Sequence, residues 1–342
     1  MGDDKSNECA RATDAVPRRR WRTCLLAAAF GVGLVLLLGV LFRDRILGPW
    51  RSEDKPFPPG VLADYVPADS EAVVAVNVRS LLESPAGRQL APSLRQLVRQ
   101  GERRFRWMGL LGIKPFDDLD SLQISFAPGS GGQPLWLARG RLDHSRFQIG
   151  PDKLQQKNVE HFRVLEYTDR SSKRTTLLAP VGDALVISDT AARVLAALKQ
   201  ARDPQPITVR NATLRELLQK VNRRQSLWLA ASTENFGLLG EVDDFVLKLI
   251  LRPLLAHTES VYGGIACEED LRAELHFRTA TEESAAKLEA DLQAVRDLSR
   301  LLGGQGGKEL RPLLQLLGTG QISREGQNVL LHCRLVADQL DG

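Results

Sequence analysis

The apolar positions over residues 24–42 form an unbroken run unlike the rest of the chain. These 19 residues read CLLAAAFGVGLVLLLGVLF and carry no charged side chain. A helix rises about 1.5 Å per residue, so this run can cross the roughly 30 Å hydrocarbon core with its backbone bonded internally. The sequence therefore predicts a transmembrane helix over 24–42.

The flanks of this run indicate its orientation. Arg18, Arg19, Arg20 and Arg22 precede it, and basic residues favour the cytoplasmic side. Residues 1–23 are thus predicted to be a cytoplasmic basic tail, and 43–60 a proline-rich tether to an extracytoplasmic body. A cleaved signal peptide stays open as the alternative. Such peptides usually have a shorter apolar region, about 7–15 residues, and a small-residue cleavage site, which 40–42 lacks.

Beyond residue 60 the apolar positions alternate or recur at helical spacing. The clearest segment is 271–278, where apolar residues alternate with Arg272, Glu274, His276 and Arg278. This period of two predicts a strand with one buried face, paired as a hairpin with 261–267. Further strands are predicted over 72–78, 121–127, 134–142, 159–167, 175–180, 184–188, 226–231, 320–323 and 329–336. Helices are predicted over 81–111, 144–156, 191–201, 213–221, 240–255 and 282–302.

This order predicts an α+β body of antiparallel sheet and helices, with a first lobe over 61–210 and a second over 211–342. The lobes share an order of elements, with offsets of 154 residues for the first strand, 139 for a hairpin and 138 for a helix. Two hypotheses fit: a diverged internal duplication, or chance likeness. A duplication would leave a concave seam between the lobes, where ligands often bind.

Charge excludes one class of partner. The formal net charge is +4, and residues 1–45 hold eight Lys/Arg against five Asp/Glu, so the body is nearly neutral. A nucleic-acid-binding protein needs a basic surface that neutralises phosphates. We therefore expect the membrane and envelope proteins as partners, and no nucleic acid.

The polar residues do not form a recognisable site. The histidines, at positions 144, 161, 257, 276 and 332, lack metal-binding spacing, and His276 and His332 are expected to face solvent. Acidic clusters occur at 117–120, 241–244 and 268–270, where capping of helices and turns is the simpler interpretation. No catalytic, cofactor-binding or metal-binding residue is predicted, and no cofactor.

Two cysteines of the body fall on the apolar side of predicted strands. Cys267 and Cys333 could form a disulfide in an oxidising compartment if their strands were neighbours with Cα atoms within about 7 Å. Two separate buried thiols are the alternative.

Three segments carry a resemblance to known proteins: VPADSEAVVAVNV at 66–78, LLESP at 81–85 and LGIKPFDDLDSL at 111–122. They resemble uncharacterised membrane-anchored bacterial proteins of the planctomycete type, as does LVISD at 185–189 followed by a helix. The resemblance implies an envelope location and this kind of fold, and no activity.

The sequence thus favours an envelope-anchored, non-catalytic interaction or scaffold protein. A lipid or small-molecule binding module, with its ligand between the lobes, is a second hypothesis. An enzyme with an unrecognised site is a third.

Overall fold

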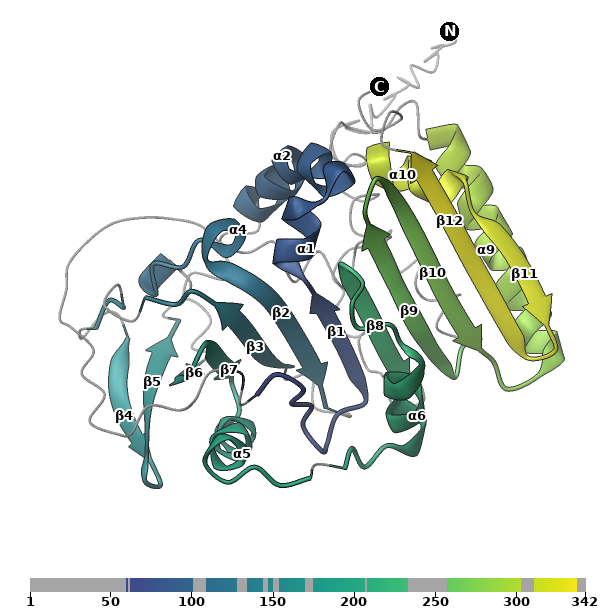
Figure 1. The fold of residues 1–342 in the computed structure, drawn as a ribbon. Helices are drawn as coiled ribbons and strands as arrows, with labels where there is room; N and C mark the ends of the chain where they lie inside the picture. The colour runs from purple at the N-terminus through teal and green to yellow at the C-terminus, as the bar shows by residue number, and fades with distance from the viewer. Residues whose placement is uncertain are drawn as a thin grey trace, which may run out of the picture.

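The computed structural model describes residues 60, 62–100, 109–127, 134–143, 147–149, 154–169, 175–206, 208–232, 257–302 and 311–336. These residues confirm an α+β body with one antiparallel sheet (Figure 1). The transmembrane helix predicted at 24–42, the tether before Gly60, the helix predicted at 240–255, His144 and the acidic cluster at 241–244 lie outside them.

Twelve strands form the sheet, in the order β11-β12-β10-β9-β8-β1-β2-β3-β7-β6-β5-β4. In chain order they are β1 (Ala72–Val76), β2 (Leu119–Phe126), β3 (Pro134–Gly140), β4 (Gln155–Val159), β5 (Phe162–Thr168), β6 (Thr175–Val181), β7 (Ala184–Ser188), β8 (Leu227–Ser232), β9 (Ser260–Cys267), β10 (Asp270–Arg278), β11 (Gln321–Glu325) and β12 (Asn328–Val336). Every pair of neighbouring strands in this order is antiparallel.

Seven helices in the described residues cover the two faces of the sheet. They are α1 (Val78–Glu83), α2 (Pro85–Gln100), α4 (Pro115–Asp118), α5 (Ala191–Arg202), α6 (Ala212–Lys220), α9 (Glu282–Leu302) and α10 (Arg311–Gly318). One face packs against residues of α1, α2, α4, α9 and α10, in a single large apolar cluster. The opposite face packs against α5 and α6, in two smaller clusters.

The helix predicted over 81–111 is divided at Ser84. The hydroxyl of Ser84 accepts a hydrogen bond from the N–H of Gly87 at 2.9 Å, and Pro85 begins α2. A side-chain acceptor followed by proline is a favourable helix start, because proline lacks the N–H that would otherwise need a partner. Pro92 lies inside α2 without ending it.

The helix predicted over 144–156 is wrong. Gln155 begins strand β4, which pairs with β5 and whose sequence is QQKNV. Four of its five residues are exposed, so this edge strand has no buried face and no period of two. Pairing with β5, rather than hydrophobic pattern, makes this segment a strand.

Five strands of each half of the sheet follow the same order. From its centre outward, the first half runs β1-β2-β3-β7-β6, and then continues to β5 and β4, while the second runs β8-β9-β10-β12-β11. The registers also agree: Ile124, Trp136 and Ile187 form one row of the first half, and Gly263, Leu275 and Leu331 form the matching row of the second. The matching positions are 139 residues apart in the first two strands of this row and 144 apart in the third.

The turns at the end of each half match as well. Gly182 follows β6 with φ of 60°, and Gly326 follows β11 with φ of 55°, and they are 144 positions apart. Each glycine is the first of two turn residues, where a left-handed conformation suits a tight hairpin. The match between the helix near 144 and the helix at 282 is wrong, because the first half has the β4–β5 hairpin where the second has α9 and α10.

The seam expected between the lobes is a hydrogen-bonded ladder. β1 and β8 pair over five residues, with Val74 opposite Leu229 at the centre. Side chains on both faces of this ladder are buried, including Val73, Val74 and Ala230. The two halves are therefore joined at the middle of one continuous sheet.

Candidate functional site

The histidines of the described residues lie on separate elements. His161 is in the turn between β4 and β5, and His257 precedes β9. His276 on β10 and His332 on β12 point away from the apolar cluster, as predicted from the alternation in these strands. Among the described histidines, His276 and His332 alone lie on the same side of two neighbouring strands.

The acidic clusters serve local structure. Asp118 accepts a hydrogen bond from the N–H of Lys114 at 2.7 Å, and Asp120 pairs with Arg79 at 2.6 Å. In the cluster at 268–270, Asp270 binds Arg272 at 2.9 Å and Arg334 at 2.6 Å. Burial acts to raise the pKa of Asp270, but the hydrogen bonds from Arg334 and Arg272 outweigh it and lower the pKa below its usual range. This carboxylate thus ties β10 to β12 as an ion.

His276 and His332 belong to a surface that we call the open face. It is the side of β10, β12 and β11 opposite the main apolar cluster, together with Tyr262 of β9, which packs in part against the α6 cluster. In Figure 1 this side is turned to the viewer with α9 behind it. Its three rows, from the register, are Glu274-His332-Gln321, Tyr262-His276-Leu330-Ser323 and Arg278-Asn328-Glu325.

Three side chains of the open face form a compact group. The rings of Tyr262 and His276 are stacked, with centroids 4.6 Å apart and planes 7° apart. Nε2 of His276 lies 2.6 Å from Oε1 of Glu274. The His276 side chain is 34% exposed, so the pair is accessible to solvent.

This group has limited chemical scope. A histidine beside a carboxylate can accept a proton, but general acid–base catalysis also requires a substrate bound within hydrogen-bonding reach of that pair. Among the described residues, no group of three or more His, Cys, Asp and Glu is arranged to hold a metal ion. The group instead presents aromatic and charged atoms on a partly exposed surface of the sheet.

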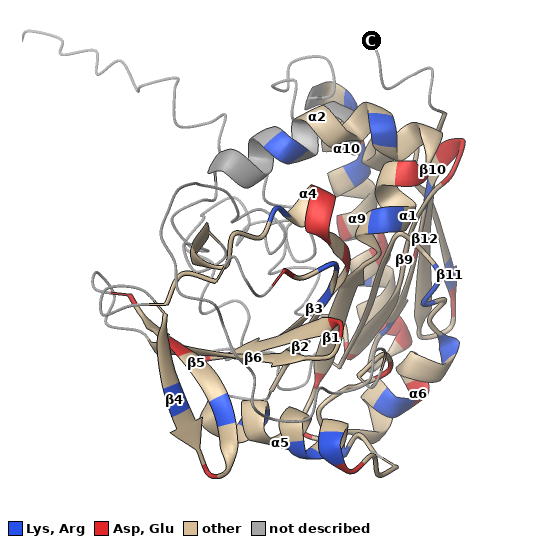
Figure 2. Cartoon of the chain, turned by 60° about the vertical axis from the view of Figure 1, so that its left-hand side comes forward, with Lys and Arg blue, Asp and Glu red and all other residues tan. Residues whose placement is uncertain are grey.

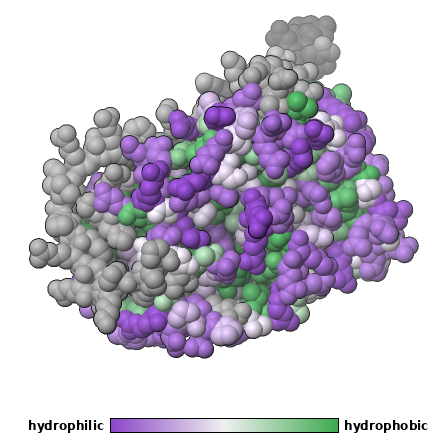
Figure 3. Space-filling model, in the orientation of Figure 1, coloured by the Kyte–Doolittle hydropathy of each residue, from purple (hydrophilic) through white to green (hydrophobic). Residues whose placement is uncertain are grey.

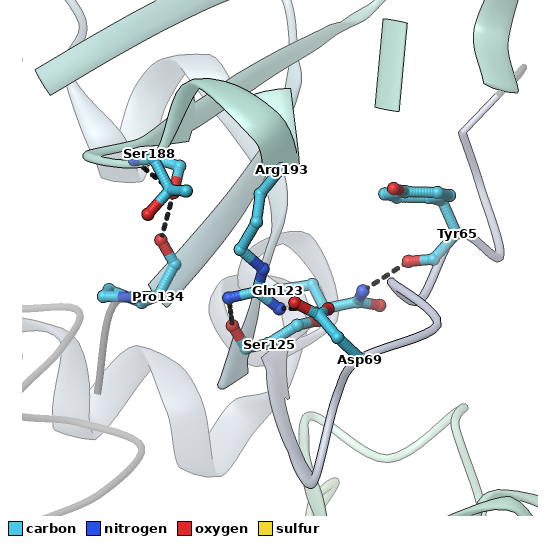
Figure 4. A network of polar contacts seen from close by, with 8 residues as sticks. Tyr65, Asp69, Gln123, Ser125, Pro134, Ser188 and Arg193 are labelled. Carbon is cyan, nitrogen blue, oxygen red and sulfur yellow. Dashed lines mark hydrogen bonds and ion pairs between the residues drawn. The ribbon is translucent and has the colours of Figure 1, made fainter. Parts of the chain in front are cut away.

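A second polar group, around Arg193 of α5, lies inside the molecule (Figure 4). Its guanidinium donates to the carbonyl of Ser125 at 3.0 Å and to Asp69 at 3.2 Å. Nearby, the Gln123 amide donates to the carbonyl of Tyr65 at 2.7 Å. These bonds fasten the segment before β1 to β2 and to α5.

The Arg193 group is suited to a structural role. Burial lowers the pKa of Arg193, and the opposing charge of Asp69 raises it in part. Burial also raises the pKa of Tyr65 to about 12. The guanidinium is already engaged by a carbonyl and a carboxylate, so it stabilises the fold rather than offering a free cation. Hydrophobic pattern does not reveal this group, because an arginine in a helix usually faces solvent.

Cys267 and Cys333 are free, buried thiols. Their strands are not neighbours, because β10 lies between β9 and β12. Cys267 is opposite Leu271, whereas Cys333 is opposite Ala273. With strands about 4.8 Å apart, two strand spacings exceed the Cα separation of a disulfide. The disulfide that the sequence left open does not form.

Charged residues are dispersed over the body. Figure 2 shows basic and acidic residues interspersed along the described elements, and Figure 3 shows hydrophilic residues over much of one face with smaller hydrophobic areas between them. This distribution agrees with the nearly neutral body counted from the sequence.

Comparisons with known proteins add little to this picture. No protein-family model matches the chain, and no curated protein matches it. A solved structure titled crystal form I of TP0453 is similar over 84% of this chain and 96% of that chain, with 12% sequence identity and a TM-score of 0.36. A likeness this distant assigns no role to any residue. Within the described residues, no helix has the length and apolar character needed to span a bilayer.

Proposed function

We propose that this chain is a membrane-anchored extracytoplasmic protein whose body is a non-catalytic interaction or scaffold module. The anchor rests on the uncharged run at 24–42, and the orientation on the four arginines before it. The role of the body rests on its open face.

The observation that carries the proposal is the difference between the two halves of the sheet. In the first half, the face towards α5 is buried, with Leu137 and Val186 in the cluster that contains Val194 of α5. The matching positions of the second half are His276 and Leu330 on the open face, which no described helix covers in the same way. We propose that another protein binds this polar, partly exposed surface of the sheet.

We further propose that the two halves arose by duplication of one unit. The shared strand order, the matching registers and the equivalent turn glycines support this. After duplication, one half kept a covered face and the other kept an accessible one, which is a simple route from a stable fold to a binding surface.

The structure favours the alternatives less. A ligand between the lobes needs a gap where β1 and β8 instead pair. An enzyme needs polar groups from several segments to converge, and the described histidines and acidic clusters lie on separate elements.

The anchor is tested by fractionation and the role of the body by partner capture. The full chain should remain in the membrane pellet after carbonate washing and enter detergent, whereas a chain lacking residues 1–45 should not pellet. Protease added outside spheroplasts should digest the body. A soluble, trimmed mature protein would contradict the anchor.

Partner capture uses the full chain in detergent after cross-linking. The charge reversal Arg278→Glu, combined with His276→Glu, should reduce recovery of specific partners several-fold, because both side chains lie on the open face. Lys199→Glu, on exposed α5 of the first half, is the matched control and should leave recovery unchanged. Equal capture by both variants would contradict a role for the open face.

A further inference from the structure

The outer edge of β11 lacks the neighbour that its counterpart has. Among the described residues, β12 is the one strand paired with β11, which lies at the margin of the sheet (Figure 1). In the first half, the matching strand β6 continues to β5, and Leu165 of β5 lies opposite Leu178 of β6. Leu178 corresponds to Ile322 of β11. The fold therefore shows an antiparallel strand as the natural occupant of this position.

The hydrogen-bonding groups at this edge follow from the hairpin. Gly326 and Gln327 form a two-residue turn between Glu325 and Asn328, which are paired. In such a hairpin the pair next to the turn is hydrogen-bonded, and bonding alternates along the strand. Gln321, Ser323 and Glu325 therefore bond to β12, whereas the N–H and C=O groups of Ile322 and Arg324 point outward.

We propose that β11 pairs antiparallel with β11 of a second copy of this chain, so that two sheets join across a twofold axis at Ser323. This inference rests on the proposed interaction function and names its partner. In this register, Ile322 bonds to Arg324 of the other copy, and Ser323 lies opposite Ser323.

Charge supports this edge over the other one. The proposed register sets Gln321 opposite Glu325 of the second copy and brings no like charges together. Arg324 is bound to Glu289 of α9 at 3.0 Å. The opposite margin, β4, carries Lys157 at its centre, so the same arrangement would oppose two lysines. An edge lysine is a common protection against unwanted strand pairing, and β11 has none.

The interface is small, and the membrane compensates for its size. A ladder of five residues a side buries less surface than the roughly 1,200–2,000 Å² of stable complexes. Two chains anchored in one bilayer have the same orientation, and each meets the other at a higher effective concentration than it would in solution. A weak contact between them is therefore occupied more often. The dimer is therefore expected for the anchored chain and much less for the isolated body.

The first test is cross-linking of the full chain in membranes, with Cys9 and Cys24 replaced by serine. Ser323→Cys should form a disulfide-linked dimer under mild oxidation, because opposed residues in a non-hydrogen-bonded pair have Cα atoms about 4.5 Å apart. Lys157→Cys is the matched control on the other edge and should give no disulfide-linked dimer, because pairing through β11 leaves the two β4 strands at opposite ends of the joined sheets. No dimer with Ser323→Cys, or an equal yield from both variants, overturns the proposal.

The second test needs no introduced cysteine. Ser323→Lys should reduce the dimer fraction of the full chain in lipid nanodiscs by about tenfold or more, because like charges face one another. Lys199→Ser, at an exposed position of α5 away from both edges, should leave the fraction unchanged. A monomeric wild-type chain, or a dimer unaffected by Ser323→Lys, overturns the proposal. Membrane pelleting and open-face partner capture would still stand in either case, so the proposed function is judged separately.

Discussion

At the scale of single residues, the polar group around the buried side chain of Arg193 is a stabilising feature that hydrophobic pattern did not reveal. The side chain is 6% exposed and joins α5, β2 and the segment before β1. Burial of a guanidinium costs free energy because the charge loses its water, and the bonds to Ser125 and Asp69 offset part of that cost.

Replacing this arginine should destabilise the body. Arg193→Ala removes the bonds to Ser125 and Asp69 and should lower the free energy of unfolding by about 2–3 kcal/mol. Lys199→Ala, in the same helix, removes an exposed ion pair with Glu160 and should cost less than about 1 kcal/mol. Urea unfolding of the two variants measures the difference, and equal losses would contradict the role given to Arg193.

The two buried thiols should be inert in the folded protein. Burial raises the pKa of Cys333 to about 11. It raises the pKa of Cys267 to about 12, although a hydrogen bond with Ser226 acts to lower that pKa. Since the thiolate is the reactive form, a maleimide or disulfide reagent at pH 8 should label neither until urea unfolds the chain. Rapid labelling before unfolding would contradict their burial.

The same thiols give stability a dependence on pH. Below about pH 8.5, the ordinary pKa of a thiol, Cys267 and Cys333 are neutral in both the folded and the unfolded chain. Above it the unfolded chain ionises first, so the free energy of unfolding should fall as the pH rises towards 11. Replacing both cysteines by alanine should reduce the fall measured by urea titration at each pH. An identical fall in that variant would assign the effect to other groups.

At the scale of elements, the two halves show how a face becomes covered or open. Leu137 on β3 and His276 on β10 occupy matching positions, yet Leu137 is 2% exposed, within the apolar cluster to which α5 contributes. Ala179 and Val181 of β6 are likewise buried, whereas Ser323 and Glu325, at the matching positions of β11, are exposed. The polarity of each strand therefore records whether a helix lies over it.

This contrast predicts opposite responses to exchanged residues. Leu137→His should lower the free energy of unfolding by about 3 kcal/mol, since it buries a polar ring and removes apolar contacts. His276→Leu should change it by less than about 1 kcal/mol, because the side chain is partly exposed. Urea unfolding tests the pair, and a large loss in His276→Leu would show that the open face is covered.

Sequence pattern predicted elements well where one side was buried. The alternation in β10 correctly identified the strand, its hairpin and the outward position of His276. Pattern failed at β4, where QQKNV has no apolar face and the partner strand decides the conformation. It also missed Arg193, because burial of a charged side chain depends on contacts with residues far away in the chain. For the same reason it could not say that β10 separates the two cysteines.

At the scale of the whole molecule, the β1–β8 ladder makes one folding unit of two similar halves. Val74 and Leu229 pair at its centre, and neighbouring side chains are buried on both faces. Neither half can lose this ladder without exposing its own central strand.

The halves should therefore unfold together. Hydrogen exchange measured by mass spectrometry at increasing urea should show amides of β3 and β7 opening at the same concentration as those of β10 and β12, as expected for a cooperative transition. Leu229→Pro breaks the central ladder, so the two halves should then open at different urea concentrations or fail to fold. Two distinct transitions in the wild-type chain would contradict a single unit.

The position of β1 has a mechanical consequence for a tethered protein. It is the first strand after Gly60, whose N–H is held by Asp183 at 2.8 Å, and it lies in the middle of the sheet. Tension transmitted from a moving bilayer would load β1 along its length, against β2 on one side and β8 on the other. Such shear requires many backbone hydrogen bonds to break at once, so the body should resist this pull better than a force that opens the ladder one bond at a time.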